Sequence, residues 1–155
     1  MLWIIIILVV AGCVAFIFLH DGDKAKRSRI APLTADRFPP EPIDLTAAKK
    51  IYRTYMLSTG LYDKEDASEG ARMFGEEVKE EIRMLKDEIS EHKNNITEIR
   101  SKLKNEMDPD EIESMNDEMK DYESEVERAS RELAQLNADK KHFLIDYINR
   151  EIQPG

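Results

Sequence analysis

Residues 2–19 constrain the fold of this chain most, because they read LWIIIILVVAGCVAFIFL and contain no charged or strongly polar side chain. As an α-helix this run would be about 27 Å long, which matches the hydrocarbon core of a bilayer. A soluble protein would need a large apolar core to bury it, and the remaining sequence is too polar to supply one. We therefore predict a transmembrane anchor at residues 1–20, with membrane-facing side chains that include Leu2, Trp3, Ile4, Ile5, Ile6, Ile7, Leu8, Phe16, Ile17, Phe18 and Leu19.

The charged residues predict which side of the membrane the rest of the chain occupies. The sequence holds 23 Lys and Arg and 32 Asp and Glu, and all of them lie after residue 20. Four bases lie within the ten residues that follow the apolar run. The positive-inside rule places such a cluster in the cytoplasm. We expect a single-pass membrane protein with residues 21–155 in the cytoplasm. The bases that set this topology, and that can also contact anionic lipid, are Lys24, Lys26, Arg27 and Arg29.

Cys13 is the only cysteine, so it forms no internal disulfide. Residues 10–13, VAGC, resemble the bacterial lipoprotein cleavage motif, which implies a lipidated cysteine. Two features differ from that motif: no Lys or Arg precedes the apolar run, and residues 14–19 continue it. A cleaved secretory signal also needs a basic segment before its apolar core. The sequence therefore favours an uncleaved signal anchor over lipoprotein processing.

Residues 21–45 are predicted to form a basic juxtamembrane segment followed by a proline-rich linker. Proline lacks a backbone N–H and fixes φ, so the run FPPEP at residues 38–42 excludes a helix and favours the polyproline II conformation. We expect a semi-rigid spacer here.

Residues 46–155 are predicted to form a helical domain. A short helix at 46–59 has Ile51, Tyr52 and Tyr55 on one face and ends at Gly60. From residue 71 to 103, and again from 112 to 147, apolar residues recur in steps of three and four, which indicates two coiled-coil seams. A capping-box pattern at residues 66–69 and an N-cap followed by proline at residues 108–109 are typical helix starts. They predict hairpin helices at about 67–106 and 109–152.

The two seams predict how the hairpin helices face each other. Pairing Leu103 with Met115 places Gly75 opposite Phe143 and Ala71 opposite Tyr147, small against large. The same register makes Glu88 and Glu132 repel, and it puts His92 and Lys140 in the seam, opposite Val126 and Val78. Near the open end of the hairpin, an apolar surface that includes Leu144 and Ile148 needs the short helix as a cover. The predicted fold class is therefore all-α: a transmembrane helix, a proline-rich linker, a short helix and a long antiparallel coiled-coil hairpin with a three-helix base and a two-helix arm.

Most of the net charge lies at the predicted hairpin turn. Residues 105–127 carry eleven Asp or Glu and one Lys, whereas the whole chain has a net charge of −9. Two interpretations fit this run: a solvated helix face, or a docking site for a basic partner. The candidate partner-contact residues are the acids at this turn and the aromatic residues at the base: Asp110, Glu111, Glu113, Asp117, Glu118, Phe143 and Tyr147.

Motifs for catalysis and metal binding are missing from the sequence. His20, His92 and His142 are far apart in the chain and form no spaced set with Cys13, so no zinc motif exists. No glycine-rich phosphate loop or nucleophile motif occurs, and a two-helix arm offers no concave pocket. Nucleic-acid binding along the arm needs clustered bases, which the acidic arm lacks. We predict neither an enzyme nor a cofactor, and no nucleic-acid partner.

These features favour a membrane-anchored scaffold or adaptor that presents a helical arm to a protein partner or to itself. The expected partners are the lipid bilayer, an unidentified protein and a second copy of the chain. One alternative is an extracytoplasmic coiled coil that spans an envelope, similar in outline to phage inner-membrane spanins or virion membrane proteins. Another is a small accessory subunit of a larger membrane complex, in which the span itself is the binding element.

Overall fold

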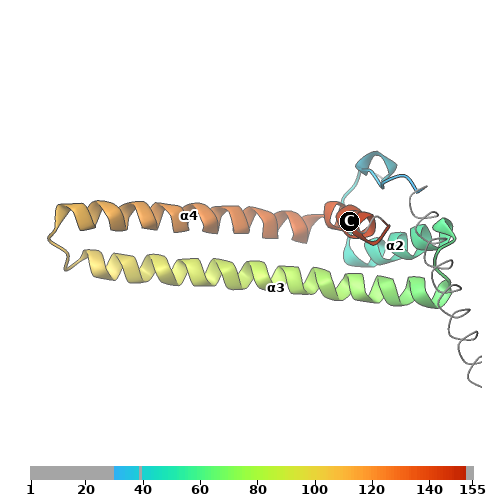
Figure 1. The fold of residues 1–155 in the computed structure, drawn as a ribbon, viewed down its shortest axis with the longest axis horizontal. Coiled ribbons are helices and arrows are strands. Elements are labelled where there is room, and N and C mark those ends of the chain that lie inside the picture. Colours follow the sequence, from blue (N-terminus) through green and yellow to red (C-terminus); the bar gives the residue numbers. More distant parts are fainter. Residues whose placement is uncertain (1–29, 39, 153–155) are drawn as a thin grey trace, which may run out of the picture.

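A computed structural model describes residues 30–38 and 40–152 of the chain. The predicted anchor, its apolar side chains and the four bases from Lys24 to Arg29 lie outside the described residues. Within them the regular structure is entirely helical: the short 3-10 helix η1 (Ala35–Arg37) and the four α-helices α2 (Leu45–Thr59), α3 (Lys64–Leu103), α4 (Pro109–Ala138) and α5 (Lys141–Ile152), with no strand. Figure 1 shows a long arm made by α3 and α4, with α2 and α5 gathered at one end.

Local capping signals define both ends of α2. The Asp44 side chain accepts a hydrogen bond from the backbone N–H of Ala47 (2.7 Å) at its start. Gly60 ends the helix in the left-handed conformation with φ of 69°, which glycine adopts without the steric cost of a Cβ atom. The predicted short helix and its C-cap are therefore confirmed.

Helix α3 begins earlier than the sequence pattern indicated. Asp63 is its N-cap, and its carboxylate accepts hydrogen bonds from the backbone N–H groups of Glu65 (2.8 Å) and Asp66 (2.9 Å). The capping box predicted at residues 66–69 was wrong, because Asp63 supplies the same kind of acceptor three residues earlier.

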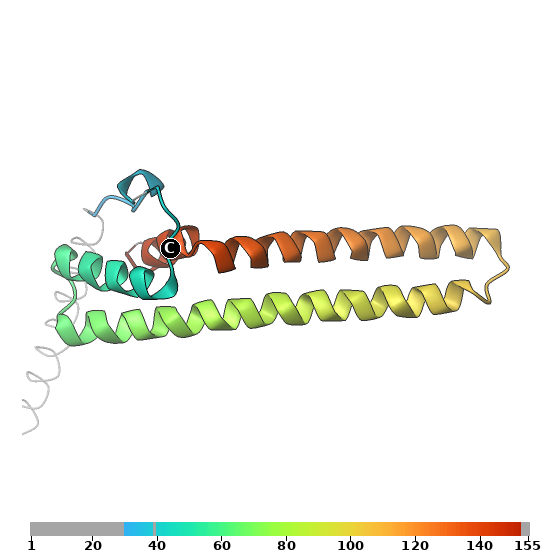
Figure 2. The ribbon, with the colours of Figure 1, turned by 180° about the vertical axis from the view of Figure 1, so that it is seen from behind.

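The predicted antiparallel hairpin is present. Helices α3 and α4 run side by side in opposite directions and meet at a short turn (Figures 1 and 2). Asp108 caps α4 through the backbone N–H of Asp110 (3.0 Å), and Pro109 occupies the first turn as predicted. Leu85 of α3 belongs to one apolar cluster with Ala129, Leu133 and Leu136 of α4.

The second hairpin helix is not continuous to residue 152, as had been predicted. It ends at Ala138, and Asp139 adopts an extended conformation (φ −145°, ψ 124°) before α5 begins. Lys140 was expected in the seam, but its ammonium donates to the backbone carbonyls of Leu136 and Asn137 at the end of α4. A cation at this position is favourable because the carboxyl end of a helix carries partial negative charge.

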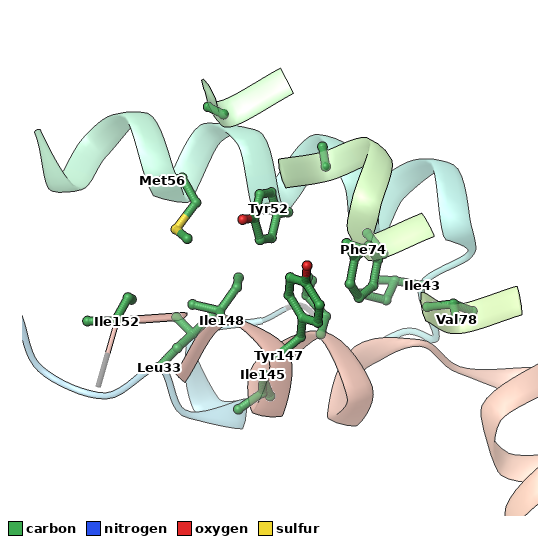
Figure 3. Packing of buried hydrophobic residues seen from close by; sticks show 14 residues of the cluster. Leu33, Ile43, Tyr52, Met56, Phe74, Val78, Ile145, Tyr147, Ile148 and Ile152 are labelled. Carbon is green, nitrogen blue, oxygen red and sulfur yellow. The ribbon is translucent and has the colours of Figure 1, made fainter. Parts of the chain in front are cut away.

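The break lets α5 turn across the base and complete the main core. Tyr52 and Met56 of α2, Phe74 of α3, and Leu144 and Ile148 of α5 are almost fully buried there. Figure 3 shows side chains from α2, α3 and α5 pointing toward one another. The predicted three-helix base is confirmed, and the apolar face of α2 has its partner.

The predicted small-against-large pairing of Gly75 with Phe143 was wrong. Gly75 faces the Lys49 side chain of α2, so it does not oppose Phe143. The residue that meets the aromatic side chains of α5 is Phe74, with ring centroids 6.1 Å from Phe143 and 5.3 Å from Tyr147. The small residues of α3 instead allow α2 to approach closely, since the Tyr52 ring lies directly over Gly70.

Residues 30–38 and 40–44, predicted as part of a spacer, pack on the base and form a strap across α5. Leu33 and Ile43 are buried in the main core. Asn149 of α5 accepts from the backbone N–H of Leu33 (2.7 Å) and donates to its carbonyl oxygen (3.0 Å). At the other end of the strap, the backbone N–H of Ile43 donates to the Asp139 carboxylate (3.0 Å). Both ends of the strap are therefore held by specific hydrogen bonds.

Candidate functional site

The tip of the arm, residues 104–118, carries seven Asp or Glu and one Lys. The backbone N–H groups of Asp108 and Met107 hydrogen-bond Glu106, and they lower the pKa of this carboxyl. Asp117 pairs with Lys120 (2.8 Å) on the same helix. The other predicted contact residues are exposed and make no salt bridge within the described part of the chain: Asp110, Glu111, Glu113 and Glu118.

Neutralisation of the tip by the facing helix is partial. Arg100 of α3 pairs with Glu123 of α4 (3.0 Å), which joins the two helices just below the tip. Lys102 pairs with Glu98 on its own helix (2.7 Å) and so does not cancel an α4 carboxylate through a close contact. The acidic field is therefore concentrated where α4 begins.

The partner-contact surface predicted around Phe143 and Tyr147 at the base is smaller than expected. Tyr147 is only 5% exposed and packs against Tyr52 and Phe74, so it is a core residue and its assignment to a partner surface was wrong. Burial raises the pKa of both tyrosines, as expected for hydroxyl groups held away from water. Phe143 is half-buried and lines an open groove of about 590 Å³ beside Leu136 and His142.

The middle of the arm holds a polar cluster that joins the two helices. Arg128 of α4 binds Glu88 of α3 and also Glu125 (2.8 Å) and Glu132 (3.0 Å) on its own helix. The hydrogen bonds that the guanidinium donates to Glu125, and then to Glu132, raise the pKa of Arg128. The repulsion predicted between Glu88 and Glu132 is relieved because Arg128 lies between them.

His92 lies one turn from this cluster and was expected to face Val126. It packs instead against the ring of Tyr122, with centroids 5.3 Å apart. Its Nε2 atom is 3.8 Å from the Glu88 carboxylate, whereas its Nδ1 atom is buried without a hydrogen-bond partner. A seam position explains this arrangement, because the ring fills space between the helices at the cost of one unpaired polar atom.

Sequence analysis missed a basic surface on α2. Lys50 and Arg53 are exposed on the side of this helix that faces away from the core, and neither makes a salt bridge within the described residues. The missed signal is visible in the sequence, since α2 carries three bases and no acid in a chain with a net charge of −9.

Neither a metal-ligand cluster nor a candidate membrane span occurs in the described part of the chain. No group of three or more His, Cys, Asp or Glu side chains there is arranged to hold a metal ion. None of the helices at 35–152 is apolar and long enough to cross a bilayer. The predicted anchor lies outside the described residues and is not addressed by this finding.

Comparison with known proteins yields no match, whether with family models, curated proteins or solved structures. The function must therefore be argued from the surfaces of the chain itself.

Proposed function

We propose that this protein is a membrane-anchored scaffold whose helical arm presents an acidic tip to a basic protein partner. One observation carries the proposal: four exposed carboxylates near the start of α4 make no salt bridge within the described residues, namely Asp110, Glu111, Glu113 and Glu118. Figure 2 shows that this end of the arm lies farthest from the base. Helix α3 contains 40 residues and is about 60 Å long, and α4, which pairs with it to form the arm, contains 30 residues and is about 45 Å long. These lengths give the tip access to partners well beyond the base.

The arrangement of the base supports the same function. The strap is held at one end by Asn149 of α5 and at the other by Asp139, which lies between α4 and α5. A chain that continues from residue 30 into a membrane anchor would therefore connect directly to a folded base. An anchor of this kind raises the local concentration of a membrane-associated partner, and a weak contact then suffices for function.

The anchor is tested by carbonate extraction of membranes that contain the full-length chain. Integral proteins stay in the pellet under these conditions, and we expect the chain to do so. Its recovery in the supernatant would contradict anchoring.

The partner site is tested with a photo-crosslinking residue at position 107, which is 91% exposed at the tip. The matched control places the same residue at Met84, which is 49% exposed on the middle of α3. We expect an adduct from position 107 only, and we expect it to disappear in the variant D110N/E111Q/E113Q/E118Q. Equal adducts from both positions, or an adduct that tolerates the four substitutions, would exclude the tip as the contact site.

Self-association of the arm is a second candidate, supported by seam residues that the hairpin covers only in part. Ile89, Met115, Met119 and Val126 all keep intermediate exposure, since a two-helix pair cannot enclose its own seam. Packing two arms into a four-helix bundle would bury them. Sedimentation of the detergent-solubilised chain at twice the mass of one copy would favour this function over binding to a different protein.

A further inference from the structure

The outward side of α2 differs in charge from the rest of the molecule. We define the basic face as Arg37, Lys49, Lys50, Arg53 and Arg72. Lys50 lies at its centre, because it borders two hollows on opposite sides of α2. The hollow toward α3 is lined by the four bases of the face other than Arg37 and by no acidic residue.

Few acids compensate for this charge. Glu69 pairs with Arg72 through two hydrogen bonds of 2.8 and 2.6 Å. Glu76 pairs with Lys79 and acts on Lys49 only at longer range. Asp36 lies beside Arg37 and bonds to Thr34. Lys50 and Arg53 consequently point their charge at solvent.

The second hollow adds apolar and aromatic side chains to the same face. It has a volume of about 660 Å³ and lies between the strap and α2, where Phe38, Ile51 and Tyr55 line it together with Lys50. Aromatic and aliphatic side chains beside bases are typical of surfaces that lie at the headgroup level of a membrane.

The length of chain before the strap limits how far this face can lie from the bilayer. Residues 21–29 separate the predicted anchor from the first described residue, and nine residues reach at most about 32 Å when fully extended. Leu33 is fixed to α5 only a few residues later. The base must therefore lie near the headgroups, whereas the acidic tip is free to lie farther away.

We propose that the basic face of α2 binds anionic phospholipid headgroups of the membrane that holds the anchor. The inference rests on the proposed anchoring, which brings the base to the lipid surface. Each base near such a surface adds to binding, and the juxtamembrane bases from Lys24 to Arg29 would extend the same positive field. The contact fixes the orientation of the base on the membrane and so limits the positions open to the arm.

The test uses the full-length chain with the substitutions C13A and S58C, labelled with the fluorophore NBD at position 58 on the rim of the apolar hollow. The chain is reconstituted into vesicles of phosphatidylcholine alone or with 30% phosphatidylserine in both leaflets. NBD emission shifts to the blue and its lifetime lengthens when the dye leaves water. We expect the long-lifetime fraction to rise by on the order of tenfold with phosphatidylserine, and to fall again in 1 M salt, where the Debye length is only about 3 Å.

Charge-reversed variants locate the contact. K50E/R53E is expected to keep the short lifetime of phosphatidylcholine vesicles even when phosphatidylserine is present. The matched control K86E/K93E makes the same change in net charge on the exposed side of α3, at residues without a salt bridge, and is expected to behave like the parent. If reversal disrupts the helical circular dichroism spectrum, the neutral variant K50Q/R53Q takes its place.

The outcomes separate this inference from the proposed anchoring. A chain that stays with the vesicles in carbonate but shows no dependence on phosphatidylserine overturns headgroup binding and leaves anchoring intact. Equal loss of signal in K50E/R53E and K86E/K93E also overturns it, because the effect is then net charge alone. A chain released by carbonate that nevertheless shows the phosphatidylserine-dependent signal supports the basic face and contradicts the anchor.

Discussion

Asp139 is the residue on which the strap, α4 and α5 converge. Its carboxylate accepts from the backbone N–H of Ile43 (3.0 Å) and from that of Lys141 (2.9 Å), so it holds the strap and starts α5. The substitution D139A leaves both donors without their partner, which costs about 1–3 kcal/mol. We expect this loss in the free energy of unfolding measured by denaturant titration. D146A, on the exposed side of α5, is the control and should change it by less than about 0.5 kcal/mol.

The same carboxylate makes stability depend on pH. Burial raises the pKa of Asp139, but the hydrogen bonds from Ile43 and Lys141 outweigh burial, and the pKa lies below its ordinary value of 3.8. A group with a lowered pKa in the folded state stabilises the fold above its unfolded pKa and loses that contribution as the pH falls. We expect the stability advantage of the parent over D139N to be present at pH 6 and to shrink below about pH 3.8. A constant difference between the two proteins from pH 6 to pH 3 would contradict this role.

Phe74 is the residue that joins the aromatic side chains of three helices. It is fully buried and contacts the rings of Tyr52, Phe143 and Tyr147 (Figure 3 labels Tyr52, Phe74 and Tyr147). Phe74→Ala removes these contacts and leaves a cavity, which costs about 3–5 kcal/mol. The adjacent Met73 is 53% exposed, so Met73→Ala should change the free energy of unfolding by only about 0.5 kcal/mol. Similar values for the two variants would show that the base core is not packed as described.

At the scale of elements, one buried polar atom of His92 weakens the packing between α3 and α4. The buried Nδ1 atom of His92 has no hydrogen-bond partner, whereas Glu88 keeps its bond to Arg128 whatever residue occupies position 92. We expect His92→Leu to stabilise the hairpin by about 1 kcal/mol, because an apolar side chain of similar length replaces an unpaired polar group. His142→Leu, at an exposed position on α5, is the control for added hydrophobicity. A lower melting temperature for His92→Leu would show that its contact with Glu88 stabilises the arm.

Helix identity and pairing were predictable from the sequence because local patterns encode them. The C-cap of α2 is Gly60, and α4 begins with Asp108 as its N-cap and Pro109 in its first turn, as the sequence predicted. The break at Asp139 was not predictable, since residues 109–152 keep a helical apolar pattern and the extended conformation depends on Ile43, nearly a hundred residues away. The strap was missed for the same reason: prolines exclude a helix but do not say what the chain packs against.

Some of the candidate surfaces could be predicted from the sequence, and others could not. The acidic tip follows directly from the composition of residues 105–127 and the position of the turn. Tyr147 was misassigned because an aromatic residue in an amphipathic helix has the same sequence signal whether it meets solvent or a third helix. The basic face required the fold, since Arg37 and Arg72 join α2 only through the strap and α3.

At the scale of the whole molecule, the proposed function requires an arm that holds its tip at a fixed distance from the base. Two features favour a stiff arm: the Arg128 cluster and the Arg100–Glu123 pair each join α3 to α4, at the middle and near the tip. The apolar cluster around Leu85 joins them again toward the base. Three separate attachments leave little room for the helices to splay.

Spin labels at positions 65 and 107 measure this stiffness, because both sites are exposed, one in the first turn of α3 and the other in the turn that follows its end. In the full-length chain without Cys13, double electron–electron resonance should give one narrow distance distribution near 60 Å, the length of a continuous helix of 40 residues at about 1.5 Å per residue. Arg128→Ala removes the middle attachment and should broaden the distribution, whereas Arg131→Ala, at an exposed site with only a same-helix partner, should not. A broad distribution in the parent would exclude a rigid arm, and the tip could then reach a partner only as a flexible tether.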